Sequence, residues 1–290
     1  MLKKKKKIAT VILTFNSEAV IKKTILAARK ISKNIIVCDS FSNDKTTKIA
    51  KSLHCKIFYK KFTTYAKKRN YIIKKCNKLY DWQLHLDADE ILSKKLIKNI
   101  NKVVDLNDKN YSYLVKRRPY FLNKKLFFGG SSNWHLRLFP SGTTLVEDNN
   151  YDQHFKSKLN TKNISGILYD TNIKNLSEWI ESHNRWSALE IKDNRSKNLK
   201  NKVQMNLFGN SIERLRFFKS IYYLTPSLIR PFILFVYKYF ILLGFLDGKI
   251  GFYYCFFNSL WFRTLIDAKK YEKNIISKNF TLKRVLRSKF

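Results

Sequence analysis

Two aspartates separated by a single residue, Asp87 and Asp89, follow a strand-like run over residues 82–86. Side chains alternate along an extended chain, so both carboxylates can point the same way with Ala88 turned between them. Two carboxylates held this close repel each other unless a cation lies between them, and hard oxygen ligands suit Mg²⁺ or Mn²⁺ carrying a diphosphate. Because an Asp-x-Asp pair is common, the competing interpretation is a solvated turn before a helix capped by Ser93.

The segments before Asp87 alternate between strand-like and helix-like patterns. Buried-strand runs occupy residues 8–16, 34–39 and 56–59, and helical spacing occupies residues 18–30, 45–51 and 64–77. This alternation predicts an α/β fold with a parallel sheet and right-handed crossovers. Ligands bind at the carboxyl ends of such strands, so the polar side chains that follow them should converge on one crevice. Those side chains are Thr14, Asn16, Asp39, Asp44, Asp87 and Asp89.

Four motifs in this order carry a resemblance to a known family. They are Thr14-Phe15-Asn16, residues 37–46, Lys68-Arg69-Asn70, and residues 86–90. Together they resemble the successive nucleotide-sugar motifs of family 2 glycosyltransferases with the GT-A fold. The amino-acid sequences of residues 39–42 and 244–248 are similar to those of the family branch that includes lipopolysaccharide core glycosyltransferases. The resemblance covers most of the chain and implies a Rossmann-like, mostly parallel sheet flanked by helices.

The resemblance also implies roles in donor binding. Thr14 and Asn16 would line the nucleobase pocket, and Asp39 would contact uracil or ribose. Asp44 would belong to the same site, and Arg69 would approach the donor from the helix before the Asp-Ala-Asp strand. Taken singly, Asn16 and Asp44 could merely cap helices, and Arg69 could be one more solvated charge. The joint order of the motifs favours a single donor site.

The metal site implied by the resemblance is centred on Asp89, with Asp87 closer to the ribose. GT-A enzymes often add a late histidine to the metal shell, and His154 within residues 151–155 is the candidate. Imidazole suits Mn²⁺ better than Mg²⁺. The competing interpretation of His154 is a packed, hydrogen-bonded side chain between aromatic neighbours.

An inverting transfer needs a base, because a carboxylate must take the proton of the acceptor hydroxyl as the diphosphate leaves. The pair Glu147-Asp148 follows a strand-like run over residues 134–139 and a second over residues 143–146, as the base-bearing segment does in the family. Many relatives in the lipopolysaccharide-core branch carry a His-Glu pair here, so the base stays open among Asp148, Glu147 and Asp152.

Two further positions have both a functional and a structural interpretation. Relatives place an arginine like Arg137 beside the diphosphate, whereas an edge-strand arginine can also simply pair with a surface carboxylate. His183 and Arg185 lie on a helix with Trp179, where the aromatic residues suit a core and the polar residues could reach acceptor or phosphate.

Composition limits the possible partners. The 290 residues are 44% hydrophobic and 15% aromatic, which suffices for one large domain plus an appendage. A formal net charge of +37 would ordinarily suggest nucleic acid or an anionic surface. Many of the lysines, however, are spread singly among asparagines and isoleucines, and no nucleic-acid module is recognisable. Nucleic acid is therefore not an expected partner.

The ends of the chain and its cysteines indicate a location. Residues 1–7 and the apolar run after them imitate a signal peptide, but no A-x-A cleavage site follows, which favours a first strand. The four cysteines form no Cys-x-x-Cys pair, so reduced thiols in a cytoplasmic protein are the simpler account.

A change of composition near Arg216 marks a second segment. Residues 217–266 are rich in aromatic and aliphatic side chains punctuated by lysine and arginine, and contain no uncharged apolar run of about 18 residues that would suit a spanning helix. This mixture suits a helical hairpin in the headgroup layer, with its turn at residues 244–251 and a basic tail at residues 269–289. Two buried helices packed on the catalytic domain are the alternative.

These observations predict a GT-A domain over residues 1–215 and a membrane-associating helical segment over residues 216–290. The expected enzyme is a metal-dependent glycosyltransferase, with Mn²⁺ or Mg²⁺, that moves a hexose from a nucleotide-diphosphate sugar to a glycan or lipid-linked acceptor. We expect the transfer to invert the configuration of the sugar and to serve the synthesis of a bacterial surface polysaccharide. We expect the enzyme to lie in the cytoplasm, at the inner face of the cytoplasmic membrane. The alternatives are a non-enzymatic basic protein that binds RNA or membrane, and a nucleotidyltransferase.

Overall fold

The computed structural model describes residues 7–147, 153–171, 175–193 and 204–287, and it divides into two compact units. The sheet unit contains residues 1–127, 131–173 and 199–217. The helical unit contains residues 128–130, 174–198 and 218–290. The predicted division placed α5 (Leu176–Asp193) with the first unit; in the structure α5 belongs to the helical unit, because it packs against α9 (Phe262–Arg287).

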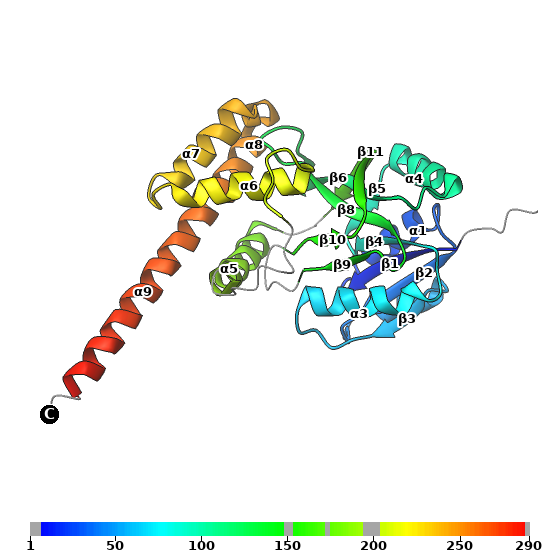
Figure 1. The fold of residues 1–290 in the computed structure, drawn as a ribbon, viewed down its shortest axis with the longest axis horizontal. Helices are drawn as coiled ribbons and strands as arrows, with labels where there is room; N and C mark the ends of the chain where they lie inside the picture. Colours follow the sequence, from blue (N-terminus) through cyan, green and yellow to red (C-terminus); the bar gives the residue numbers. More distant parts are fainter. Residues whose placement is uncertain (1–6, 148–152, 172–174, 194–203, 288–290) are drawn as a thin grey trace, which may run out of the picture. The chain divides into compact units, whose positions relative to one another are not determined.

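The sheet unit is built on a nine-stranded mixed sheet (Figure 1). Its first half is parallel and has the order β3-β2-β1-β4. The second half continues with β8-β6-β11-β5 and contains antiparallel pairs, with β7 added to β6. The strands are β1 (Ile8–Thr14), β2 (Asn34–Asp39), β3 (Lys56–Tyr59), β4 (Trp82–Asp87), β5 (Glu90–Leu92), β6 (Tyr111–Phe121), β7 (Lys124–Lys125), β8 (Asn133–Pro140) and β11 (Asn160–Asp170).

Helices cover both faces of the parallel half because its strands are apolar on both sides. Along β1, Ile8 and Ile12 face a core that also contains residues of α1 (Ile21–Ala28), α2 (Thr46–Ser52) and α4 (Lys94–Leu106). The alternate residues, such as Val11, face α3 (Tyr65–Asn77) on the opposite side. The alternation of side chains along a strand thus decides which helix packs on which face.

Register brings the predicted strand ends together. Thr14 at the end of β1 pairs with Asp39 at the end of β2, and Leu13 pairs with Asp87 at the end of β4. The strands are parallel, so their carboxyl ends lie at the same edge of the sheet. The predicted convergence of these three strand ends is confirmed.

A two-stranded sheet, β9 (Thr144–Val146) with β10 (Phe155–Ser157), flanks the larger one, and α6 (Ser211–Leu224) begins in the sheet unit. Val146, Phe155 and Ile212 join a cluster with Ile73 of α3. This cluster positions the segment in which the base was predicted.

The helical unit contains α5, the end of α6, and a succession of short helices. They are α7 (Arg230–Val236), η2 (Tyr237–Ile241), η3 (Gly244–Asp247), α8 (Gly248–Cys255) and η4 (Phe256–Trp261), and the longer helix α9 follows them. The turn between η2 and α8 is tight, since a Cβ atom added at Gly251 would lie 2.0 Å from the carbonyl oxygen of Gly244. Only a glycine at this position allows so close an approach.

Candidate donor-binding and catalytic site

The loops after β1 and β2 are joined around Asp39. Oδ2 of Asp39 accepts hydrogen bonds from Oγ1 of Thr14 at 2.9 Å and from Oγ of Ser42 at 2.5 Å, and Oδ1 accepts the backbone N–H of Ser42 at 2.8 Å. Asp39 has no exposed surface. The expected contact of Asp39 with uracil or ribose is therefore not available in this conformation, because burial and three hydrogen bonds hold the carboxylate inside the loop. The structure gives Asp39 and Thr14 a supporting position.

Asn16 and Asp44 complete the junction between the loops. Asn16 is exposed, has a positive φ of 44°, and accepts the N–H of Asn43 at 3.1 Å. Asp44 accepts the N–H of Glu18 at 3.0 Å and that of Thr46, the first residue of α2, at 2.9 Å. Burial would raise the pKa of Asp44, but these hydrogen bonds lower it. Asp44 thus joins the start of α2 to the loop after β1, whereas Asn16 is accessible to a ligand.

Phe41 is a strained and exposed residue at this edge. Its φ is +62°, a left-handed conformation that is a genuine outlier for a bulky side chain, and 60% of its surface is exposed. The centroid of its ring lies 5.6 Å from the ring centroid of Tyr59, the last residue of β3. The strained conformation does not bury the ring in the core. The ring is therefore available for stacking with a ligand.

Helix α3 contributes two buried cations. Lys68 donates from Nζ to the carbonyl oxygen of Thr14 at 2.7 Å, and burial lowers the pKa of Lys68 to about 8. Arg69 donates from Nη2 to Oδ1 of Asp87 at 2.5 Å and from Nη1 to the carbonyl oxygen of Leu86 at 3.3 Å. Arg69 is thus a buried partner of the Asp-Ala-Asp motif and not one more solvated charge.

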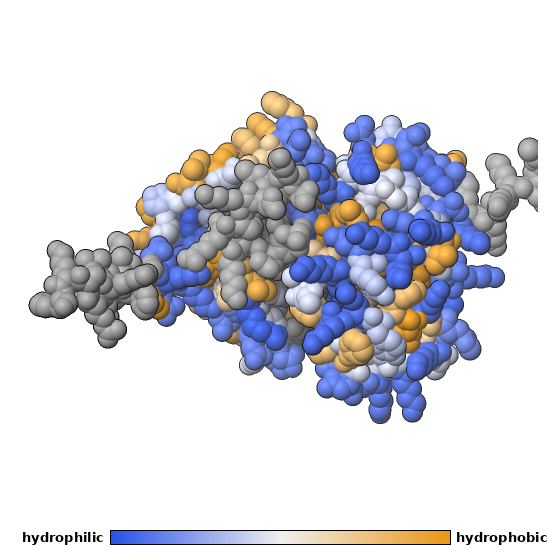
Figure 2. Space-filling model, turned by 60° about the horizontal axis from the view of Figure 1, so that its bottom comes forward, coloured by the Kyte–Doolittle hydropathy of each residue, from blue (hydrophilic) through white to orange (hydrophobic). Residues whose placement is uncertain are grey.

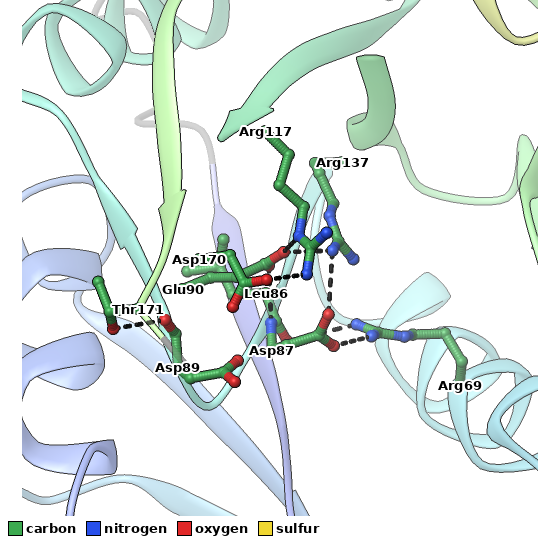
Figure 3. Close-up of polar contacts among 9 residues, drawn as sticks. All are labelled: Arg69, Leu86, Asp87, Asp89, Glu90, Arg117, Arg137, Asp170 and Thr171. Carbon is green, nitrogen blue, oxygen red and sulfur yellow. Dashed lines mark hydrogen bonds and ion pairs between the residues drawn. The ribbon is translucent and has the colours of Figure 1, made fainter. Parts of the chain in front are cut away.

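Carboxylates and guanidinium groups alternate at the end of β4 (Figure 3). Arg137 of β8 lies 3.0 Å from Oδ2 of Asp87 and 2.5 Å from Oε1 of Glu90. Arg117 of β6 lies 3.2 Å from the same oxygen of Glu90 and also binds Asp170 at the end of β11. Burial would raise the pKa of Asp87, but Arg137 and Arg69 hold it well below its usual range.

Asp89 is the one acid of this cluster without an arginine partner among the described residues. Four carboxylates, of Asp87, Asp89, Glu90 and Asp170, face three guanidinium groups, of Arg69, Arg117 and Arg137. In Figure 3 the dashed line at Asp89 ends on its backbone carbonyl oxygen, which accepts a hydrogen bond from Oγ1 of Thr171 at 2.8 Å, and not on its carboxylate. Burial and the neighbouring carboxylates of Asp170, Asp87 and Glu90 raise the pKa of Asp89 to about 8. A bound cation would relieve this excess of negative charge.

His154 does not join these carboxylates. Within the part of the chain that the structure describes, no three histidine, cysteine, aspartate or glutamate side chains gather closely enough to hold a metal ion. His154 is buried at the start of the β9–β10 ladder, where its carbonyl oxygen accepts the N–H of Glu147 at 3.0 Å. The predicted ligand set of Asp87, Asp89 and His154 is therefore not assembled, because strand pairing holds the histidine in the smaller sheet.

Glu147 is poorly placed to act as a base. Its side chain has no exposed surface, its Oε2 lies 2.5 Å from Nη2 of Arg216, and the same oxygen accepts the N–H of His154 at 3.2 Å. A buried carboxylate in an ion pair cannot reach an acceptor hydroxyl. Asp148 and Asp152, the other two candidates, lie outside the described residues.

Asn70 anchors the segment that leads to these candidates. From α3 it donates to the carbonyl oxygen of Val146 at 2.9 Å and accepts the N–H of Val146 at 2.7 Å. The Lys68-Arg69-Asn70 motif therefore connects three elements through adjacent residues: the end of β1, the end of β4 and the start of the segment in which the base was predicted.

Sequence reasoning missed Glu90, Arg117 and Asp170 as site residues. Asp170 ends strand β11, so the strand-end argument applied to Asp87 could have found it. Arg117 lies within a Lys-Arg-Arg run that resembled ordinary surface charge. His183 and Arg185 belong to the helical unit, where His183 stacks on Trp179 with ring centroids 3.4 Å apart. This contact favours the packed interpretation of His183.

A parallel half-sheet of order 3-2-1-4, extended by antiparallel strands and carrying acidic residues at the end of the fourth strand, defines a GT-A type of nucleotide-sugar transferase fold. The family model for glycosyl transferase family 2 matches residues 10–166, more than half of the chain. The chain belongs to this family. The predicted fold class and family are confirmed, and the two non-glycosyltransferase alternatives lose their support.

Curated relatives agree with this assignment. The chain is 26% identical to the lipopolysaccharide core biosynthesis glycosyltransferase LpsC of Rhizobium meliloti over 230 residues, which are 75% of this chain and 76% of LpsC. It is 35% identical over 113 residues to an uncharacterized glycosyltransferase of Rickettsia typhi. That match spans only 38% of either protein.

Comparison with solved structures finds distant similarity to two glycosyltransferase-type proteins. TarS of S. aureus, residues 1–349, aligns over 92% of both chains with a TM-score of 0.45 and 12% identity. The glucosyl-3-phosphoglycerate synthase of Mycobacterium tuberculosis, solved with Mn²⁺, UDP and glucosyl-3-phosphoglycerate, aligns over 40% of this chain and 44% of its own with a TM-score of 0.32 and 19% identity. These scores are too low to transfer the role of any residue.

Proposed function

We propose that this glycosyltransferase moves a hexose from a nucleotide-diphosphate sugar to a glycan or lipid-linked acceptor, with inversion and with a divalent cation, in the synthesis of lipopolysaccharide core or a related surface polysaccharide. Family membership and the likeness to LpsC support the class and the pathway. The observation that carries the donor chemistry is the surplus carboxylate Asp89, two residues after Asp87, at which β4 ends beside the end of β1.

The residues at the end of β4 suit a cation in part. Asp89 would be its principal ligand, since Oδ1 and Oδ2 of Asp87 already bind Arg69 and Arg137. Asp87 would contribute from a side chain that is 38% exposed. When bound, Mn²⁺ or Mg²⁺ would supply electrostatic stabilisation of the leaving diphosphate. The remaining ligands would be phosphate oxygens and water, as Mg²⁺ usually has in such sites.

Other residues would bind and orient the donor. Asn16 would contact the nucleobase from its exposed position, and Asp39 would act indirectly by holding Ser42 and Thr14. Arg69 and Arg137 would keep Asp87 ionised and oriented. Asp148 would take the proton of the acceptor hydroxyl, since Glu147 is committed to Arg216.

A ligand panel tests the proposal. Thermal denaturation of the full chain would be followed with nucleoside diphosphates and nucleotide sugars, each with Mn²⁺, with Mg²⁺ and with chelator. A bound ligand stabilises the native state in proportion to the logarithm of its concentration over its dissociation constant. We expect one nucleotide family to raise the melting temperature only when the metal is present. Stabilisation that is equal in chelator would contradict the metal, and no stabilisation by any nucleotide would contradict the donor class.

A further inference from the structure

A stripe of large apolar side chains runs along the outside of α7 and η2 in the helical unit. Each of its members is at least 47% exposed: Ile229, Phe232, Ile233, Val236, Tyr237, Phe240 and Ile241. Successive members are separated alternately by three residues and by one, which places them on one side of a continuous helix. Figure 2 shows apolar surface along this helical part of the molecule.

The charged residues of the same helices are turned inward. Arg230 is buried and donates from Nε to Oδ2 of Asp267 at 2.8 Å. Lys238 donates from Nζ to Oδ1 of Asn258 at 2.7 Å. A helix on the surface of a water-soluble protein has the opposite arrangement, with charges outside and apolar side chains inside. The stripe therefore fits an apolar surrounding medium.

The apolar surface continues around the tight turn into α8. Leu243, Phe245, Leu246, Phe252 and Tyr253 are each between 40% and 54% exposed. The turn that presents them is packed and not a loose loop, since Gly244 and Gly251 are in close contact. Asp247, the one acid of residues 228–253, accepts the N–H of Phe128 at 2.9 Å. The exposed side chains are thus held by a defined structure.

Charge and length select a lipid surface as the partner. Residues 218–290 contain 13 lysines and arginines and three acidic residues. Arg230–Ile241 forms a bent pair with Gly244–Ile276, with an angle of 70° between them. The first member has 12 residues. It is therefore about 18 Å long at 1.5 Å per residue, whereas the hydrocarbon core is about 30 Å thick. Among the described residues no single helix is long and apolar enough to cross a membrane. Only this bent pair, taken together, has the length and composition of a membrane segment.

We propose that the stripe Ile229–Ile241 and the turn after it insert into one leaflet of an anionic bilayer, with the basic residues of the helical unit at the headgroups. Tyr237 and Tyr253 are suited to the interface because each has an apolar ring and a polar tip. The exposure of these side chains within the helical unit supports the hairpin over two buried helices. The proposal does not depend on the identity of donor or acceptor.

A variant matched by a control tests this surface. The variant Ile233→Ser, Phe240→Ser, Ile241→Ser removes apolar area from the stripe. The control Leu26→Ser, Leu79→Ser, Leu106→Ser removes it from side chains of the sheet unit that are 47%, 50% and 70% exposed. Co-sedimentation of the full chain would use vesicles of phosphatidylcholine with about a third phosphatidylglycerol, at low and high salt. Circular dichroism and gel filtration would establish folding and oligomeric state.

We expect the wild type and the control to bind equally and the stripe variant to bind at least about tenfold more weakly, since three apolar groups lose their burial. High salt should weaken wild-type binding without abolishing it, because only the electrostatic part is screened. Equal binding by the stripe variant, or no binding by the wild type, would overturn the proposal. A wild-type dimer that the stripe variant converts to a monomer would overturn it too, because the stripe would then be covered by a second copy.

Discussion

Oε1 of Glu90 lies 2.5 Å from the guanidinium group of Arg137, and the side chain of Glu90 has no exposed surface. Oε2 of Glu90 accepts the N–H of Asp87 at 2.9 Å, so one buried carboxylate holds both the arginine and the backbone of the Asp-Ala-Asp motif. Glu90 is thus a positioning residue for the end of β4.

Replacing Glu90 by glutamine should destabilise the protein strongly. Arg137 and Arg117 would lose a charged partner in a buried place, and breaking such a pair costs on the order of 3 kcal/mol. Asp108→Asn is the matched control, because Asp108 pairs with Lys162 at the surface at 3.5 Å and exposed pairs contribute up to about 1 kcal/mol. Urea denaturation would compare the midpoints. Equal shifts for the two variants would show that Glu90 has no special role.

Asp89 and Asp87 should respond in opposite ways to the same substitution. Asp89→Asn removes a carboxylate with no arginine partner among the described residues, so the metal-free protein should keep or gain stability while transfer is lost. Asp87→Asn leaves Arg69 and Arg137 without their shared partner and should lower the melting temperature. Melting curves in chelator, followed by transfer assays with Mn²⁺, would measure both effects. Full transfer by Asp89→Asn would remove Asp89 from the site.

The base is tested by three isosteric substitutions. Asp148→Asn should lower turnover by roughly two to four orders of magnitude and leave donor affinity nearly unchanged. Glu147→Gln should mainly lower stability, because Glu147 is buried against Arg216. Asp152→Asn is the third arm. Steady-state kinetics with a fixed acceptor and nucleotide titration would separate turnover from binding. If only Asp152→Asn is inactive, Asp152 is the base.

Phe41 should contribute to donor binding through its ring. Phe41→Gly relieves the left-handed strain at φ +62°, so the variant should be at least as stable as the wild type. It should nevertheless bind nucleoside diphosphate more weakly, since stacking of a base on an aromatic ring contributes about 1–3 kcal/mol. Phe41→Tyr keeps the ring and serves as the control. Calorimetric titration that gives the same dissociation constant for Phe41→Gly and the wild type would assign the ring no role.

Local patterns were sufficient to predict the parallel half of the fold, because its strands are short, largely apolar runs that alternate with helical spacing and are followed by polar residues. They also placed Asp87 and Asp89 at a strand end beside Thr14 and Asp39, as the register shows. Patterns could not show that Asp39 is fully buried, because burial depends on how the loop after β2 closes over it. For the same reason Glu147 appeared available as a base, although Arg216, 69 positions away in sequence, pairs with it.

The ionic cluster shows the same limit on a larger scale. Asp87 meets an arginine 50 positions away, and Arg117 meets an aspartate 53 positions away. Such partners become neighbours only through the order of strands β4, β8, β6 and β11, which no local pattern contains. Glu90 was within a recognised motif, but its role depends on those distant arginines.

The last prediction concerns Lys238 and pH. Burial lowers the pKa of Lys238 to about 8, with Arg263 contributing, and the ammonium donates to Asn258 at 2.7 Å. Unfolded lysine has a pKa of about 10.4, so between pH 8 and pH 10.4 the folded protein binds fewer protons than the unfolded chain. This contribution to stability therefore rises with pH through that window, and below pH 8 the full cost of the buried charge is present.

Lys238→Met removes that cost and should melt at a higher temperature than the wild type at neutral pH, by about 2–4 °C for each kcal/mol gained. The advantage should shrink as the pH rises above about 8, where the wild-type lysine loses its proton. Part of the gain is offset because Asn258 loses its donor, which costs about 1 kcal/mol. Lys249→Met, at an exposed lysine of the same unit, is the control. A difference between Lys238→Met and the wild type that stays constant from pH 7 to pH 10 would contradict the half-buried, destabilised ammonium.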